Sequence, residues 1–94
     1  MRTAAKRDAN EREIIDALER IGCTVYQMDR PVDLAVGYRA RNFFIEVKDG
    51  NKPPSRRKLT KDQQKFFKTW KGQVRQVETV DEALDLVTQA YEPA

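Results

Sequence analysis

Two carboxylates and a lysine lie within a short stretch of this 94-residue chain, and together they could support metal-assisted hydrolysis of a phosphodiester bond. Asp33 is followed 13 residues later by Glu46-Val47-Lys48. Carboxylate oxygens, with a backbone carbonyl such as that of Val47, are ligands that Mg²⁺ accepts while it keeps several waters. The ammonium group of Lys48 could then act on a metal-bound water or on a phosphate oxygen.

Each of these residues also has a simpler structural interpretation. Asp33 could be a turn residue, and Glu46 with Lys48 could form an ion pair between strands. The surroundings of Glu46 weigh against that alternative, because it stands in the stretch Phe-Phe-Ile-Glu-Val-Lys, where an unpaired carboxylate would be costly. The combination of the three residues therefore favours a catalytic site.

The composition excludes several other kinds of chemistry. The chain has no His, which excludes Ser-His-Asp and Cys-His relays and any imidazole metal ligand. Its single cysteine, Cys23, allows neither an intrachain disulfide nor a Cys-rich zinc site. We expect Cys23 to be a small buried hydrophobe in a protein of a reducing compartment.

Length and hydropathy predict one soluble domain over residues 1–94, with its core at about 8–88. A typical domain takes roughly 100 to 200 residues, so this chain has room for a single core. No apolar run approaches the ~18 residues needed to span a bilayer, and the N-terminal stretch is not typical of a signal peptide. We therefore expect a cytoplasmic protein without membrane contact.

Basic residues are concentrated in one segment, although the net charge is only +3. Residues 51–75 contain nine Lys and Arg and one acid, whereas residues 76–94 contain five acids and no base. A local positive field attracts a polyanion, although a charged segment can also be a solvated surface. The residues that we expect to bind a polyanion are Lys52, Arg56, Arg57, Lys58, Lys61, Lys65 and Lys68.

The elements that must position these residues follow from apolar periodicity and turn signals. A first helix is expected over residues 8–21, with an apolar stripe formed by Ile14, Ile15, Leu18 and Ile21. Asp8, with Glu11 three residues later, has the form of a capping box at its start. Gly22 stands where such a helix would end.

Three strands are expected next, the last two as a hairpin, at residues 23–27, 33–37 and 42–48. Antiparallel pairing would bring the start of one hairpin strand beside the end of the other, so Asp33 and Glu46 would meet. We expect these two residues and Lys48 to lie at one edge of the sheet rather than in the core.

A basic loop rich in Pro and Gly is expected at residues 49–59. Thr60 then begins a helix, with Gln63 as its capping-box partner and an apolar core face formed by Phe66, Phe67 and Trp70.

A fourth strand is expected at residues 73–77, and Thr79 with Glu82 begins a last helix. The order αβββαβα predicts an α/β fold in which helices flank a small mixed sheet.

Asp33 and Glu46-Val47-Lys48 resemble the bipartite motif of the PD-(D/E)xK nuclease superfamily. The stretch Asn-Glu-Arg-Glu-Ile-Ile-Asp-Ala-Leu-Glu-Arg-Ile-Gly is similar to the first helix of Holliday-junction resolvases. The same helix, the Glu-Val-Lys strand and the stretch Leu-Thr-Lys-Asp-Gln are similar to virus-type replication-repair nuclease (VRR-NUC) domains. The resemblance covers about residues 8–88 and implies a restriction-endonuclease-like core. The chain departs from the motif at Pro31-Val32-Asp33, where the family has Pro and Asp adjacent.

The resemblance also implies roles for individual residues. Asp33 and Glu46 correspond to metal ligands, with the carbonyl of Val47, and Lys48 corresponds to the catalytic lysine. Glu11 corresponds to a further acidic ligand that the first helix contributes.

Two of the implied site residues, Glu11 and Gln63, also have a structural interpretation. Glu11 also fits the capping box with Asp8, and Glu13 is the alternative acid if the helix register differs. Gln63 matches a glutamine that these domains often place near the site, but it also fits the capping box with Thr60.

The function implied by the resemblance is a Mg²⁺-dependent, structure-specific endodeoxyribonuclease of repair or recombination, in which Mn²⁺ could replace Mg²⁺. Its substrate would be branched DNA, a four-way junction or a flap, bound through the basic segment. The alternatives are a non-catalytic DNA-binding module that keeps the fold, a monomeric flap nuclease or nickase, and a metalloenzyme acting on RNA or on another substrate.

A homodimer is expected, because a junction has two symmetric exchange points and a chain this short forms a small core. The apolar surface for such an interface could come from Tyr38, Phe43 or Trp70.

Overall fold

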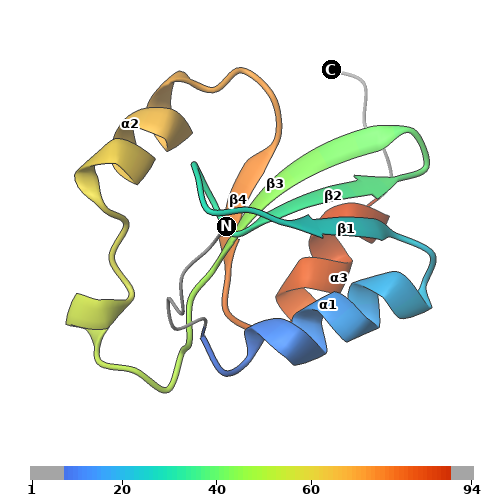
Figure 1. The fold of residues 1–94 in the computed structure, drawn as a ribbon, viewed down its shortest axis with the longest axis horizontal. Coiled ribbons are helices and arrows are strands. Elements are labelled where there is room, and N and C mark those ends of the chain that lie inside the picture. Colours follow the sequence, from blue (N-terminus) through green and yellow to red (C-terminus); the bar gives the residue numbers. More distant parts are fainter. Residues whose placement is uncertain (1–7, 90–94) are drawn as a thin grey trace.

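The computed structural model describes residues 8–89, which fold into a four-stranded sheet and three α-helices in the order α-β-β-β-α-β-α (Figure 1). The elements are α1 Glu11–Arg20, β1 Thr24–Gln27, β2 Leu34–Tyr38, β3 Arg41–Val47, the 3-10 turn η1 Pro54–Arg56, α2 Lys61–Thr69, β4 Val74–Val77 and α3 Val80–Thr88. The predicted element order and the α/β class are confirmed. The predicted domain limits also include residues 1–7 and 90–94, which lie outside the described residues.

The strands follow the order β1-β2-β3-β4 across the sheet. β1 pairs antiparallel with β2, and β2 pairs antiparallel with β3, whereas β3 and β4 are parallel. A parallel pair requires a long crossover connection, and here the connection includes η1 and α2. The sheet is therefore mixed, as predicted, and β3 is an interior strand.

β2 and β3 form the predicted hairpin through a two-residue turn at Arg39 and Ala40. Both residues have left-handed backbone angles, with φ of 52° and 65°. Two successive residues with positive φ are the signature of a type I′ turn, whose twist matches that of the flanking strands.

The core lies on one face of the sheet, which α1 and α3 both cover (Figure 1). Alternate residues of β3 point to this face because side chains alternate along a strand. Cys23 is buried there, as expected, whereas Ile21 follows the end of α1 and is exposed. The core cluster is formed by Ile14, Ile15, Leu18, Cys23, Leu34, Val36, Phe43, Ile45, Val47, Val77, Ala83 and Val87.

The start of α1 differs from the prediction. The helix begins at Glu11 with Asn10 as its N-cap, so Glu11 is the first helical residue and the predicted capping box with Asp8 is wrong. The Asp8 carboxylate instead pairs with Lys52, at 2.6 Å between Oδ1 and Nζ. An ion pair with Lys52 of the basic loop is thus present in place of the predicted capping box between Asp8 and Glu11.

α2 begins at the predicted capping box, in which Thr60 Oγ1 accepts from the Gln63 N–H and Gln63 Oε1 accepts from the Thr60 N–H. The predicted core face of this helix is wrong, because no α2 residue is buried. Phe66 and Trp70 instead contact Phe44, which points away from the main core, with ring centroids 5.8 and 5.2 Å from that of Phe44. α2 therefore packs through a separate aromatic cluster of Phe44, Phe66 and Trp70.

α3 begins at the predicted cap, where Thr79 Oγ1 accepts from the Glu82 N–H at 3.1 Å. The Glu82 carboxylate accepts from the Glu78 N–H at 2.6 Å rather than from the Thr79 N–H. Among residues 8–89, no helix has the length and apolar character needed to cross a bilayer.

Candidate active site

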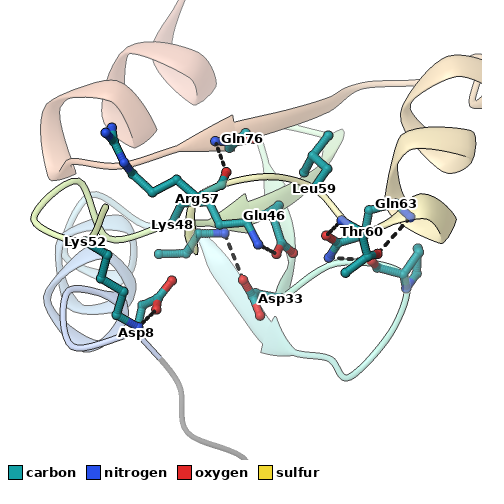
Figure 2. A network of polar contacts seen from close by, with 12 residues as sticks. Asp8, Asp33, Glu46, Lys48, Lys52, Arg57, Leu59, Thr60, Gln63 and Gln76 are labelled. Atoms are coloured by element: carbon teal, nitrogen blue, oxygen red, sulfur yellow. Dashed lines mark hydrogen bonds and ion pairs between the residues drawn. The ribbon is translucent and has the colours of Figure 1, made fainter. Parts of the chain in front are cut away.

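Asp33 and Glu46 lie opposite each other at the open end of the β2-β3 hairpin (Figure 2). Leu34 pairs with Ile45 in the antiparallel ladder, so the next residue outward is Asp33 on one strand and Glu46 on the other. Asp33 Oδ2 accepts a hydrogen bond of 2.8 Å from the N–H of Val47. The predicted meeting of the two carboxylates is confirmed by this register.

Lys48 lies beside this pair and on the same face of the sheet as Glu46 (Figure 2). Its Nζ is 3.0 Å from Glu46 Oε2, and both side chains are largely shielded from water. The ion pair considered as the simpler interpretation is thus present, although it joins two residues of one chain segment rather than two strands. The ion pair between Glu46 and Lys48 does not include Asp33, whose Oδ2 accepts from the Val47 N–H.

Glu46 is a buried carboxylate, with only 4% of its surface exposed. The expectation that the site residues lie outside the core is therefore wrong for Glu46. Its Oε1 is also buried and has no hydrogen-bond partner among the described residues. A buried carboxylate oxygen without a partner is costly, so this position favours the arrival of a proton or a cation.

The surroundings of Glu46 disfavour its negative charge. Burial is the main reason that the pKa of Glu46 is raised above its ordinary value, and the nearby Asp33 raises that pKa further. Lys48 and the amide of Gln63 act in the opposite direction and lower the pKa. A divalent cation between the two carboxylates would compensate both charges.

Gln63 connects the start of α2 to this site (Figure 2). Its Oε1 accepts from the Thr60 N–H, while its Nε2 donates to the carbonyl of Pro31 at 3.4 Å. The same amide stabilises the charged form of Glu46. The capping box is therefore observed, and the Gln63 amide contacts the loop that leads into Asp33.

Glu11 is buried, but its Oε2 accepts a hydrogen bond of 2.9 Å from the Gln27 side chain of β1. Within residues 8–89, no group of three or more His, Cys, Asp or Glu side chains could hold a metal ion together. The structure thus brings Asp33 and Glu46 together without Glu11. Glu13, the alternative acid, is exposed on α1.

Asp33, Glu46 and the carbonyl of Val47 could nevertheless hold one Mg²⁺. Mg²⁺ is usually bound through one or two carboxylates, with waters and substrate phosphates completing its coordination. The unpartnered Glu46 Oε1 is an oxygen that such an ion would satisfy. The N–H of Val47 already orients the second carboxylate, that of Asp33.

The residues expected to bind a polyanion fall into two groups. Lys52 pairs with Asp8, and Arg57 pairs with Glu78 at 3.3 Å between Nη1 and Oε2. The other five are exposed and form no ion pair within the described part of the chain. We call these five the free basic residues: Arg56, Lys58, Lys61, Lys65 and Lys68.

Asn10 is a residue of this region that the sequence patterns did not single out. Its side-chain amide donates to the carbonyl of Lys48 at 3.0 Å and to the carbonyl of Glu78 at 2.7 Å. It therefore fastens the start of α1 to the chain just after β3 and just after β4. An Asn immediately before an apolar periodic run is a signal of a helix N-cap, and that signal could have identified it.

Comparison with protein-family models, curated proteins and solved structures found no match to this chain. The resemblance to PD-(D/E)xK nucleases therefore stays a prediction from the residues themselves.

Proposed function

We propose that this protein is a Mg²⁺-dependent endodeoxyribonuclease that hydrolyses phosphodiester bonds of branched DNA in the cytoplasm, with a restriction-endonuclease-like core. Mn²⁺ would be able to replace Mg²⁺. The observation that carries the proposal is the meeting of Asp33 with the buried Glu46, whose Oε1 has no hydrogen-bond partner among the described residues, beside Lys48.

The proposed roles follow from these positions. Asp33, Glu46 and the carbonyl of Val47 would hold the metal ion, which would supply Lewis acidity for the hydrolysis. Lys48 turns its ammonium from Glu46 toward the phosphate, where it stabilises the charge that develops on the oxygens. Gln63 holds the start of α2 against the loop that leads into Asp33.

DNA binding would rest on the free basic residues, which offer positive charge without competing carboxylates. Contacts of this kind position the phosphate backbone but do not read bases. Recognition would then depend on the shape of the DNA, in agreement with a structure-specific enzyme. Cutting both strands of a junction would require two copies of the site, so we infer that the active form is a homodimer.

The direct test is cleavage of a four-way junction, a flap, a duplex and a single strand, each with Mg²⁺ and with EDTA. Asp33→Asn, Glu46→Gln and Lys48→Met should each lower the cleavage rate by at least about 100-fold. Binding measured in EDTA should change little, and circular dichroism should show an unchanged fold. Asp85→Asn on α3 and Arg20→Met on α1 are the control variants, since both residues are exposed and their helices pack on the core face of the sheet, opposite Glu46.

A variant that still cleaved within about threefold of wild type, about 0.65 kcal/mol of barrier, would show that its residue does not have the proposed role. Metal binding has a separate readout. Mg²⁺ should raise the melting temperature of the wild type, because a ligand that binds only the folded state stabilises it, and should not raise that of Glu46→Gln.

The second candidate function is a DNA-binding module without catalysis. The ion pair between Lys48 and Glu46 favours it, because that pair gives both residues a structural role. Binding of all DNA forms without cleavage in either Mg²⁺ or Mn²⁺ would select this alternative.

A further inference from the structure

A groove of about 530 Å³ lies on the face of the sheet opposite the main core. It is lined by the row Tyr26, Ala35 and Phe44, which are register partners across β1, β2 and β3, and by Gly37 and Trp70. Ala35 thus lies between Tyr26 and Phe44, and Gly37, the next residue of β2 on this face, has Thr24 and Asn42 as its partners. The two small residues leave a slot that is bordered in part by aromatic rings.

The groove adjoins the candidate active site on the same face. Side chains two residues apart along a strand point the same way, so Ala35 shares its face with Asp33, and Phe44 shares its face with Glu46. Two residues of an extended strand span only about 7 Å. An occupant of the groove would therefore lie next to the phosphate of a substrate bound at Asp33, Glu46 and Lys48 through the proposed metal ion and the lysine ammonium.

The aromatic residues of the groove are unusually exposed. Tyr26 is 70% exposed and Trp70 is 44% exposed, and they are two of the three large hydrophobic residues that the described part of the chain leaves exposed. Trp70 is also held in place, because its ring stacks on Phe66 at 5.3 Å and contacts Phe44. A fixed, exposed ring on a concave surface is suited to a flat, unsaturated partner.

We propose that this groove binds an unpaired nucleobase of the DNA substrate, adjacent to the phosphate that is cleaved. Bases stack on aromatic side chains, and proteins that bind single strands combine such stacking with a positively charged surface. Lys61, Lys65 and Lys68 supply that charge on α2, the helix that precedes Trp70. The inference rests on the proposed function for the position of the phosphate, and it narrows the substrate to DNA with unpaired nucleotides at the incision.

Gly37 is the position at which a side chain can be added to the groove. A Cβ atom at this position would meet no heavy atom within 4 Å, and the backbone angle there is not left-handed. Gly37→Leu should therefore fit the strand and project into the groove. Gly37→Ala is the matched control, because it adds a Cβ but leaves most of the groove open.

Trp70 is the only tryptophan of the chain, so its fluorescence reports on the groove. We would titrate the protein in EDTA with a short oligothymidylate and with an abasic oligomer of the same length and charge. The oligothymidylate should quench Trp70 fluorescence and bind at least about 5-fold more tightly, equivalent to about 1 kcal/mol of stacking. Gly37→Leu should lose this difference and keep its affinity for the abasic oligomer, while Gly37→Ala should retain the difference.

Equal affinity for the two oligomers, or an undiminished difference in Gly37→Leu, would overturn the proposal. A change of Trp70 fluorescence with protein concentration in the absence of DNA that is lost in Gly37→Leu would also overturn it, because a second copy would then occupy the groove. The measurement uses no divalent metal and is independent of cleavage. If the protein cleaves DNA but does not prefer the base-containing oligomer, only the proposal of nucleobase binding in the groove is refuted. If it prefers that oligomer but does not cleave DNA, only the proposed nuclease activity is refuted.

Discussion

Burial, repulsion by a carboxylate and attraction by a lysine all affect the pKa of Glu46. Burial and Asp33 raise its pKa, while Lys48 and Gln63 lower it, and the result is a raised pKa. Between the ordinary value of 4.5 and the raised value, the folded protein holds more protons than the unfolded chain. The free energy of unfolding must therefore fall as pH rises through that window.

Glu46→Gln should remove this dependence, because glutamine resembles the protonated acid and does not titrate. In EDTA, we expect Glu46→Gln to be more stable than wild type at neutral pH, and the difference to shrink as pH falls below the ordinary pKa of glutamate. Asp33→Asn should weaken the dependence by removing the nearby negative charge. Urea unfolding between about pH 4 and 8 measures both effects. A less stable Glu46→Gln at neutral pH would mean that the ion pair with Lys48 outweighs burial and repulsion.

The β2-β3 hairpin depends on a turn whose residues are not those that the turn type favours. Arg39 and Ala40 both adopt left-handed angles, which cost a residue with a Cβ roughly 1–2 kcal/mol relative to glycine. Because the hairpin sets the register of Asp33 and Glu46, the turn contributes indirectly to the site.

Ala40→Gly should stabilise the protein by about 0.5–1 kcal/mol, since glycine adopts a positive φ without steric cost. The matched control is Ala35→Gly in β2, where the same substitution should be destabilising by roughly 0.5–1 kcal/mol. Thermal or urea unfolding of the two variants gives the comparison. A loss of stability in Ala40→Gly would show that the left-handed turn is not strained.

α2 carries three exposed lysines at i, i+4 and i+7, which share one side of the helix. If they contact DNA phosphates, replacing Lys65 and Lys68 by Gln should flatten the slope of log affinity against log salt by roughly 0.9 per lost contact on duplex DNA. Arg12→Gln is the control, because Arg12 lies on α1 and pairs with Asp16. An unchanged slope in the double variant would show that this side of α2 is only solvated.

The molecule as a whole is small, at 10.9 kDa, and its described part has one core under one face of the sheet. Of the three residues considered for a dimer interface, Phe43 is buried and cannot contribute, which corrects that expectation. Trp70 lines the groove assigned to a nucleobase. Tyr38, at the end of β2 beside the hairpin turn, is the remaining one.

Light scattering at micromolar concentration should give a mass about twice that of the chain, in keeping with a symmetric pair. If Tyr38 contributes to the interface, Tyr38→Glu should shift the protein toward the monomer. Thermal unfolding of the variant is the control, because Tyr38 is half-buried and also packs against the core. A monomeric wild type that nicks junctions once without resolving them would contradict the dimer and favour a flap nuclease or nickase.

The elements of this fold and the meeting of Asp33 with Glu46 could be predicted from the sequence, because the signals for them are local. Apolar periodicity, the capping residues Thr60 and Thr79, and a hairpin-length link all act over a few neighbouring residues. The hairpin register then follows from where the link lies.

Contacts between distant segments set the properties that the sequence did not reveal. Asp8 pairs with a lysine 44 residues away, and Asn10 bonds to carbonyls 38 and 68 residues away, so α1 begins where these contacts hold it. Packing between helices and strands likewise decides three further features. Glu46 is buried, Glu11 is hydrogen-bonded to Gln27, and no residue of α2 is buried. Pattern within one segment cannot specify them, since burial and pairing arise only when separate segments pack together.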